Sequence, residues 1–179
     1  MDSKRIKDFG ILLGHMNENL TVSTDVVVRK ARNGMGVFAN RSFSDDEKIF
    51  EVKGTLVTGD IDEDLSDRVR DNLIRYDEDR YISPEGELGV YINHSCLPNS
   101  AIRKEGNKLI LVSISPISSG EEIVMDYSAI TGDDDIWELV CNCGEKNCRG
   151  IIKNFGSLPK MLRKDYIARK IVPGYVWEL

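Results

Sequence analysis

The sequence lacks any apolar run long enough to cross a membrane. It also lacks a secretory signal, because the charged opening at residues 1–8 is followed by only a short apolar patch. Internal repeats, low-complexity tracts and long linkers are missing too. These absences predict an intracellular protein, cytoplasmic or nuclear, that forms one domain with small appendages and makes no contact with a membrane.

An excess of basic residues is also missing. The 179 residues include 24 Lys and Arg against 30 Asp and Glu, a formal net charge of -6. This balance argues against direct binding of nucleic acid and mildly favours a basic partner, although ordinary solubility explains it equally well. The hydrophobic share of 41% is enough for a core, so the chain should fold alone.

Cysteine is scarce and clustered. Three of the four cysteines, Cys141, Cys143 and Cys148, lie within eight residues, which is one thiolate short of a structural zinc site. Cys96 can supply the fourth. Two disulfides in a secreted protein are the alternative, but the close spacing and the missing export signal favour thiolates bound to zinc in a reducing compartment. The metal would then join the C-terminal segment to the segment around Cys96.

That segment, Tyr91–Ser100, combines an aromatic ring, an imidazole, a thiol and several small polar groups. Pro98 ends regular strand pairing and favours a turn. Such a composition suits a buried strand poorly. It suits the floor of a site, where main-chain and polar groups point at a ligand.

The rest of the chain reads as short strands and turns. The β-branched run Val26–Val28 leads through the glycine-containing turn Arg32–Gly36 into Val37–Ala39, which predicts a hairpin. Further strands are expected at Lys48–Val52, Thr55–Thr58, Tyr81–Ser83 and Lys108–Ser115. Glu121–Tyr127 is expected to run back as the partner of the Lys108–Ser115 strand.

Two helices are expected as well. The acidic stretch Asp60–Arg80 repeats an apolar residue every four positions, at Ile61, Leu65, Val69 and Leu73, which fits a solvated helix with one apolar stripe. Near the end, apolar residues follow Pro159 at helical spacing, namely Leu158, Met161, Leu162 and Tyr166, and Pro173-Gly174 is expected to stop that helix. We expect this tail to pack back onto the domain.

Four motifs together resemble one family. They are the turn Gly34–Ala39, the stretch Asn93–Asn99, the run Gly120–Tyr127 and the three-cysteine tail, in that order. Over residues 24 to 151 the chain resembles the SET-domain protein lysine methyltransferases. The resemblance implies a mostly-β fold of small sheets with short helices and a pseudoknot-like threading of the C-terminal segment. It divides the chain into an N-terminal extension (1–23), a SET domain (24–130), a zinc-binding post-SET segment (131–151) and a C-terminal helix and tail (152–179).

The resemblance also implies an activity and its residues. The family transfers a methyl group from S-adenosylmethionine to the ε-amine of lysine in a histone or another protein. Tyr127 matches the catalytic tyrosine of the family. The cofactor-binding residues would be Gly34, Met35, Gly36, Asn93 and His94, and the zinc ligands Cys96, Cys141, Cys143 and Cys148. Taken alone, the two glycines would merely form a turn. Asp126 is an alternative general base, but alternation along a strand would point it away from Tyr127, so a structural role is expected.

Three departures from the family pattern bear on the substrate channel. Val52 and Val90 replace more polar residues, and Met125 stands where the family commonly has Phe or Tyr, which leaves the number of methyl groups added open. In the family, the insert at Asp60–Arg80 forms a wall of the peptide groove, so its acidic residues would attract a basic substrate segment; the alternative is a solvated helix face with no partner. The rival function is a catalytically silent zinc module that binds peptide. The joint presence of Tyr127, the Asn93-His94 pair and the glycine turn favours the enzyme.

Overall fold

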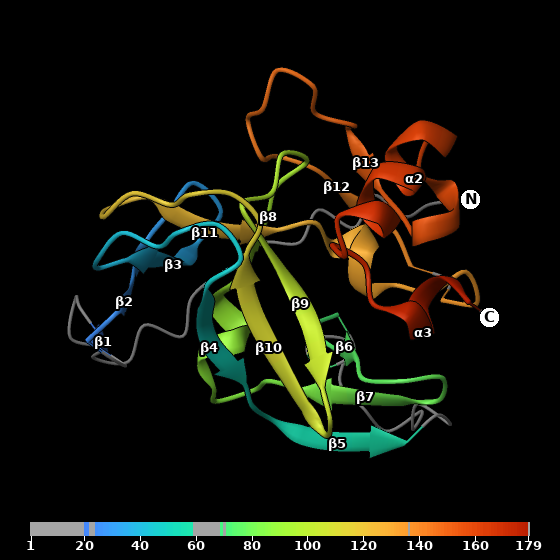
Figure 1. The fold of residues 1–179 in the computed structure, drawn as a ribbon, viewed down its shortest axis with the longest axis horizontal. Coiled ribbons are helices and arrows are strands. Elements are labelled where there is room, and N and C mark those ends of the chain that lie inside the picture. The colour runs from blue at the N-terminus through green and yellow to red at the C-terminus, as the bar shows by residue number, and fades with distance from the viewer. Residues whose placement is uncertain (1–19, 22–23, 59–68, 70, 136, 179) are drawn as a thin grey trace, which may run out of the picture.

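The computed structural model describes residues 20–21, 24–58, 69, 71–135 and 137–178. In this part of the chain, short strands form four small sheets and the helices are short, as expected for a mostly-β fold (Figure 1). The strands are β1 (Leu20–Thr21), β2 (Val26–Lys30), β3 (Met35–Ala39), β4 (Lys48–Val52), β5 (Thr55–Thr58), β6 (Ile74–Arg75), β7 (Arg80–Ser83), β8 (Asn93–His94), β9 (Ser100–Glu105), β10 (Lys108–Ser113), β11 (Glu122–Met125), β12 (Leu139–Val140) and β13 (Ile151–Ile152). The helices are the 3₁₀ helices η1 (Leu88–Tyr91), η2 (Tyr127–Ile130) and η3 (Phe155–Ser157), and the α-helices α2 (Lys160–Ala168) and α3 (Gly174–Trp177).

The largest sheet has the order β1-β2-β3-β11-β8. Its β2–β3 hairpin is the one predicted from the sequence, and Gly34 takes a positive φ of 78° in the turn, a conformation that glycine adopts without steric cost. Strand β11 pairs antiparallel with β3 and parallel with β8. The sheet therefore brings the glycine turn, the Asn93-His94 pair and the segment before Tyr127 side by side.

The predicted pairing of β11 with β10 is wrong. Strand β10 lies between β4 and β9, and all its residues after Lys108 are buried. Both of its edges are thus occupied by other strands. A bridge between Ile117 and Phe43 directs the chain away from the β10 sheet before β11 begins.

The predicted helix over Asp60–Arg80 is wrong at its C-terminal end. Ile74–Arg75 is a strand, β6, which pairs with β7 in the sheet of order β5-β7-β6, and both of its residues are buried. Burial of an arginine on a strand is not compatible with a solvated helix face. Residues 59–68 and 70, which carry Ile61 and Leu65, lie outside the described residues.

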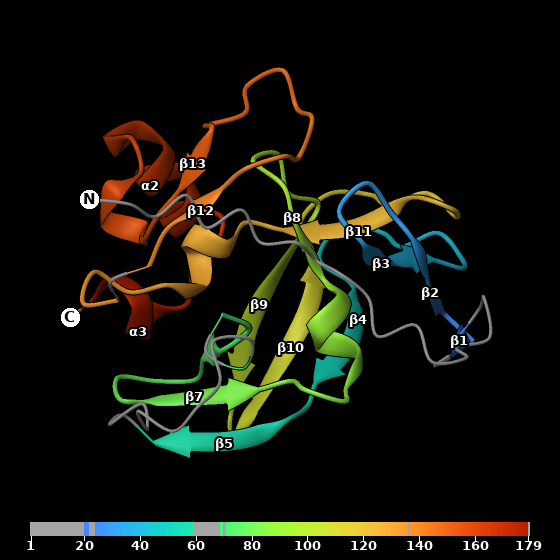
Figure 2. The ribbon, with the colours of Figure 1, turned by 180° about the vertical axis from the view of Figure 1, so that it is seen from behind.

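The C-terminal tail packs onto the domain as expected. Helix α2 lies beside β12 and β13, and α3 lies on the same side of β8, whereas the hairpin β2–β3 lies on the other side (Figures 1 and 2). Apolar side chains of the tail form a second core cluster that includes Phe155, Tyr166 and Val176. Pro159 precedes α2 as predicted, but Pro173 precedes α3 instead of ending a helix, because α2 already ends at Ala168. No helix among the described residues is long and apolar enough to span a membrane.

Candidate active site and metal centre

The parallel pairing of β8 with β11 assembles the centre of the candidate site. Asn93 is in register with Val124, and His94 with Met125. Strand β11 ends at Met125, two residues earlier than the sequence predicted, and Tyr127 is the first residue of η2. Alternation along a strand therefore does not orient Tyr127, whose place is set by the start of the 3₁₀ helix.

Tyr127 is held by hydrogen bonds from both its side chain and its main chain. Its hydroxyl donates a hydrogen bond of 2.8 Å to the carbonyl of Ile92, and its main-chain N–H donates one of 3.2 Å to Nδ1 of His94. The ring lies between His94 and Trp137, with centroid distances of 5.3 and 6.2 Å. Burial raises the pKa of Tyr127, and the nearby charge of Glu122 raises it further. The hydroxyl is therefore protonated at neutral pH.

His94 connects Tyr127 to the cysteine cluster. The side chain is only 8% exposed, and burial lowers its pKa to about 4, with Arg149 lowering it further and Asp126 opposing the shift. The imidazole is thus neutral at pH 7. Because Nδ1 accepts the N–H of Tyr127, we assign the proton to Nε2, which lies 3.3 Å from Sγ of Cys96. The side chain faces inward, so the predicted cofactor contact of His94 would fall to its main chain.

Asn93 lies directly against the glycine turn. Its Nδ2 donates hydrogen bonds to the carbonyl of Met35 at 3.1 Å and to Oε1 of Glu122 at 2.7 Å. A Cβ added at Gly36 would come within 3 Å of both the Ala31 side chain and the Glu122 carboxylate. Gly36 is therefore required by close packing, whereas Gly34 is favoured by its positive φ. The structure brings together the residues predicted to bind the cofactor.

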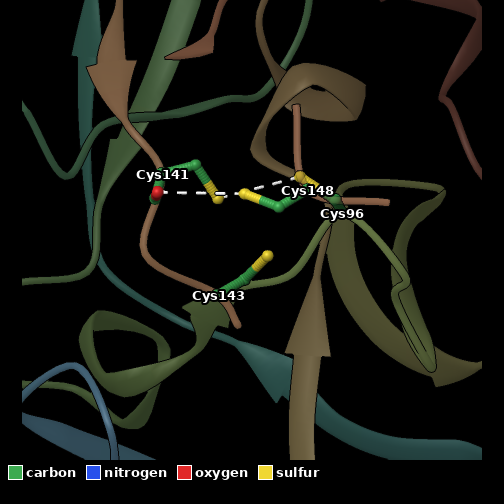
Figure 3. A group of neighbouring side chains, drawn as sticks. All are labelled: Cys96, Cys141, Cys143 and Cys148. Carbon is green, nitrogen blue, oxygen red and sulfur yellow. Dashed lines mark hydrogen bonds between the residues drawn. The ribbon is translucent and has the colours of Figure 1, made fainter. Parts of the chain in front are cut away.

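The four cysteines come together from two segments of the chain, Cys96 from one and the other three from residues 141–148. Figure 3 shows the side chains of Cys96, Cys141, Cys143 and Cys148 gathered in one cluster. All four Sγ atoms lie within 4.8 Å of one another, and those of Cys96 and Cys141 are 3.7 Å apart. Four thiolates at about 2.3 Å around a tetrahedral zinc ion would be separated by about 3.8 Å, so the donor set and the spacing fit zinc. A separation of 3.7 Å is too long for a disulfide bond.

Main-chain groups complete the surroundings of the sulfurs. The N–H of Arg149 donates to Sγ of Cys96 at 3.4 Å, and that of Gly150 donates to Sγ of Cys148 at 3.5 Å. Such donors stabilise thiolates. Burial raises the pKa of the Cys96 and Cys141 thiols, so metal binding must displace their protons.

The cysteine segment also contacts the turn between β2 and β3. Nδ2 of Asn33 donates a hydrogen bond of 3.4 Å to the carbonyl of Asn142. The guanidinium of Arg32 packs so closely on Gly144 that an added Cβ there would lie 2.7 Å from Arg32 Cζ. The cluster thus supports the turn that carries Gly34, Met35 and Gly36.

Asp126 accepts hydrogen bonds from several elements. It is 1% exposed, and its carboxylate accepts hydrogen bonds from Arg149 Nη2 at 2.6 Å, the Tyr166 hydroxyl at 2.9 Å and the Ser128 N–H at 3.0 Å. With its oxygens so engaged, the carboxylate ties the cysteine segment and α2 to the start of η2. This geometry supports the expected structural role over that of a general base. Sequence reasoning missed both Arg149 and Tyr166, whose distance along the chain gave no indication of the contact.

Comparison with known proteins assigns the family. The SET domain family model matches residues 34–128, which is more than half of the chain. The chain belongs to the SET-domain family. The protein named "Histone-lysine N-methyltransferase, H3 lysine-4 specific" of Saccharomyces cerevisiae is 30% identical over 136 residues, which cover 69% of this chain and 13% of that protein. Histone-lysine N-methyltransferase 2B of Homo sapiens is 31% identical over 135 residues, covering 69% of this chain and 5% of that protein. The chain thus spans only a small part of these curated relatives.

Solved structures confirm the fold. KRYPTONITE in complex with mCHG DNA and SAH has a TM-score of 0.54 at 23% identity, covering 70% of this chain and 28% of that chain. KRYPTONITE in complex with mCHH DNA, an H3(1-15) peptide and SAH has a TM-score of 0.54 at 22% identity, covering 70% of this chain and 29% of that chain. The predicted SET-domain fold of small β-sheets is confirmed. The pseudoknot-like threading of the C-terminal segment stays a prediction.

Proposed function

We propose that the protein transfers a methyl group from S-adenosylmethionine to the ε-amine of a lysine in a protein substrate. The observation that carries the proposal is the position of Tyr127, whose hydroxyl is held on the Ile92 carbonyl where β8 and β11 meet, next to the glycine turn. Support comes from relatives named as histone-lysine methyltransferases and from structural neighbours solved in complex with SAH.

Methyl transfer requires few catalytic side chains. When bound, S-adenosylmethionine supplies an electrophilic methyl group, so the side chains need to hold a neutral amine in line with it and exclude water. A lysine amine has an unperturbed pKa of about 10.4, and insertion into an apolar channel disfavours its cation. The protonated hydroxyl of Tyr127 would orient the reacting groups as a fixed hydrogen-bonding dipole.

The cofactor would lie along the β2–β3 turn. Gly34, Met35 and Gly36 would follow its methionine end, and Asn93 and His94 would contact it, His94 through main-chain groups. Close packing at Gly36 leaves no room for a side chain between Asn93 and the turn.

Zinc is the second group that we propose. Cys96, Cys141, Cys143 and Cys148 would bind it and thereby hold the cysteine segment against the cofactor turn. Thiolates of this kind need a reducing compartment, which fits the cytoplasm or the nucleus. We also propose the domain division at residues 23, 130 and 151 that the resemblance implied.

The substrate would be a histone or another protein with a lysine in a basic segment, in keeping with the net charge of -6. One neighbour was solved with an H3 peptide, and both were solved in complex with DNA. For this chain we propose a peptide substrate without direct binding of nucleic acid.

The decisive experiment incubates the protein with isotopically labelled cofactor, histones and a proteome extract, and maps the modified residues by mass spectrometry. We expect label on lysine. If the wild-type protein binds peptides but labels no lysine in any sample, the alternative of a catalytically silent peptide-binding module is correct.

A further inference from the structure

Arg75 is a fully buried arginine whose donors are all used. Its side chain has 0% exposure. Nε donates to the carbonyl of Asp77, and Nη2 donates to the carbonyl of Glu78. The Asp134 carboxylate accepts from both Nη1 and Nη2, and Asp135 accepts from Nη1 at 3.1 Å. A guanidinium has five N–H groups, and these five contacts satisfy all of them.

Such burial is costly unless the charge is paired and hydrogen-bonded. The two-pronged contact with Asp134 is the geometry for which arginine is suited and lysine is not. We call Arg75, Asp134 and Asp135 the Arg75 clamp. It joins the hairpin of β6 and β7 to the loop Thr131–Asp135, which follows η2.

Further hydrogen bonds and close packing hold the loop Thr131–Asp135 against Arg75. Asp135 also accepts hydrogen bonds of 2.6 Å from the Gly132 N–H and from the Tyr81 hydroxyl. A Cβ added at Gly132 would collide with the Arg75 guanidinium. The carbonyl of Arg75 accepts the hydroxyl of Tyr175 at 3.1 Å, which anchors the same point to the C-terminal tail.

Both ends of the loop Thr131–Asp135 are connected to Tyr127, one by a hydrogen bond and the other through Trp137. At one end, the hydroxyl of Thr131 donates a hydrogen bond of 2.8 Å to the carbonyl of Tyr127. At the other end, the N–H of Trp137 donates to the carbonyl of Asp135 at 3.1 Å. The indole of Trp137 lies 6.2 Å from the Tyr127 ring at an interplanar angle of 55°.

We propose that Arg75 is a positioning residue, which holds the loop Thr131–Asp135 so that Trp137 lies beside Tyr127 and lines the approach of the substrate amine. The first part rests on the geometry alone. The second part rests on the proposed function, because an indole attracts cationic ammonium groups and both a lysine side chain and its methylated product are cations in water. The simpler alternative is that the clamp only stabilises the fold.

The position of Trp137 can be tested without any methyl transfer. The chain has two tryptophans, so in a Trp177→Phe background the fluorescence reports on Trp137 alone. Arg75→Lys keeps the positive charge but loses the two-pronged contact with the Asp134 carboxylate. We expect the emission of Trp137 to shift to the red and to be quenched more strongly by acrylamide. Arg80→Gln is the matched control, because Arg80 pairs with Asp77 on the same hairpin without touching the loop. If the emission is the same in Arg75→Lys as in the control, Arg75 does not position Trp137.

A milder variant covers the case in which Arg75→Lys does not fold. Asp134→Asn removes one charged partner whose side chain is 59% exposed, and it leaves Asp135 and both carbonyl contacts in place. We expect a smaller red shift of the same sign. No shift in this variant, with the loop contacts of Asp135 intact, would also contradict the proposal.

The role toward the substrate needs a double-mutant cycle. We expect Arg75→Lys and Trp137→Leu each to raise the KM for a lysine peptide about tenfold, the size of one cation–aromatic contact, with cofactor affinity nearly unchanged. The double variant should be no worse than the single ones, because both changes remove the same contact. If the rise in KM of the double variant is the product of the two single rises, the proposal is wrong. A wild-type protein without transfer would overturn the proposed function and the role toward the amine, whereas unchanged fluorescence would overturn the positioning of Trp137.

Discussion

The hydroxyl of Tyr127 donates a hydrogen bond of 2.8 Å to the carbonyl of Ile92, which immediately precedes the Asn93-His94 pair. This bond spans 35 residues of the chain and fixes the proposed catalytic group to the floor of the proposed cofactor site. Any movement of β8 relative to η2 would therefore displace the hydroxyl. The strictest test of the enzyme assignment changes this oxygen alone.

Tyr127→Phe should abolish most of the methyl transfer while leaving cofactor binding nearly intact. The substitution removes one hydroxyl and almost no volume, and a single positioned hydrogen-bonding group of this kind typically contributes about a hundred- to a thousand-fold in rate. Single-turnover kinetics with a peptide that the wild type methylates measure the loss. The control is Tyr76→Phe, which removes a hydroxyl bonded to the carbonyl of Asn107 in another part of the core. Full activity of Tyr127→Phe would leave Tyr127 as a packing residue.

Replacing any of the four cysteines by serine should release zinc and abolish activity. We expect a single zinc ion per chain in the wild type, and one missing thiolate leaves an incomplete ligand set. Elemental analysis of protein purified without added metal measures the content, and cofactor titration reports whether the turn near Arg32 has lost its support. Metal-free protein with full activity would contradict both the zinc site and its supporting role.

Gly36→Val and Asn93→Ala should each weaken S-adenosylmethionine binding. A side chain at position 36 would collide with Ala31 and Glu122, and Asn93→Ala removes the hydrogen bond that holds the Met35 carbonyl. Calorimetric titration measures the affinity. Gly120→Asn is a suitable control, because Gly120 lies in another turn with a positive φ and open space around it, and asparagine tolerates this conformation. Normal affinity in both test variants would place the cofactor elsewhere.

The Arg75 clamp should make the stability of the folded protein depend on pH in the acidic range. The hydrogen bond from Arg75 holds the pKa of Asp134 below its ordinary value, with burial opposing the shift. A folded-state pKa below the unfolded one, about 3.9 for Asp, stabilises the protein above that pH, and this stability is lost as the pH falls through the folded pKa. We therefore expect Asp134→Asn to lower the melting temperature more at pH 7 than at pH 3.

The control for this comparison is Asp79→Asn, at an exposed position of the β6–β7 hairpin that the clamp does not contact. Thermal melts of the wild type and both variants across this pH range test the expectation. An Asp134→Asn difference that is equally large at pH 3 and pH 7 would show that the carboxylate charge is not what stabilises the clamp.

Short stretches of the sequence by themselves determined the β2–β3 hairpin, the cysteine cluster and the family. The glycine turn predicted the β2–β3 hairpin because few residues other than glycine adopt its backbone conformation. The four cysteines predicted one cluster, because three neighbouring thiols need a fourth to complete a zinc site. The order of the motifs identified the family and hence the mostly-β fold.

The tertiary structure decided which strands pair and which charges are buried. Strand β11 has a composition that would pair with β10 equally well, but β4 and β9 already occupy both edges of β10. The stretch around Arg75 was predicted to be a solvated helix. Arg75 and Asp134 lie 59 residues apart, and only folding brings them into contact. The charge partners of a buried arginine follow no periodic pattern in the sequence, so they become recognisable only when folding has brought them together.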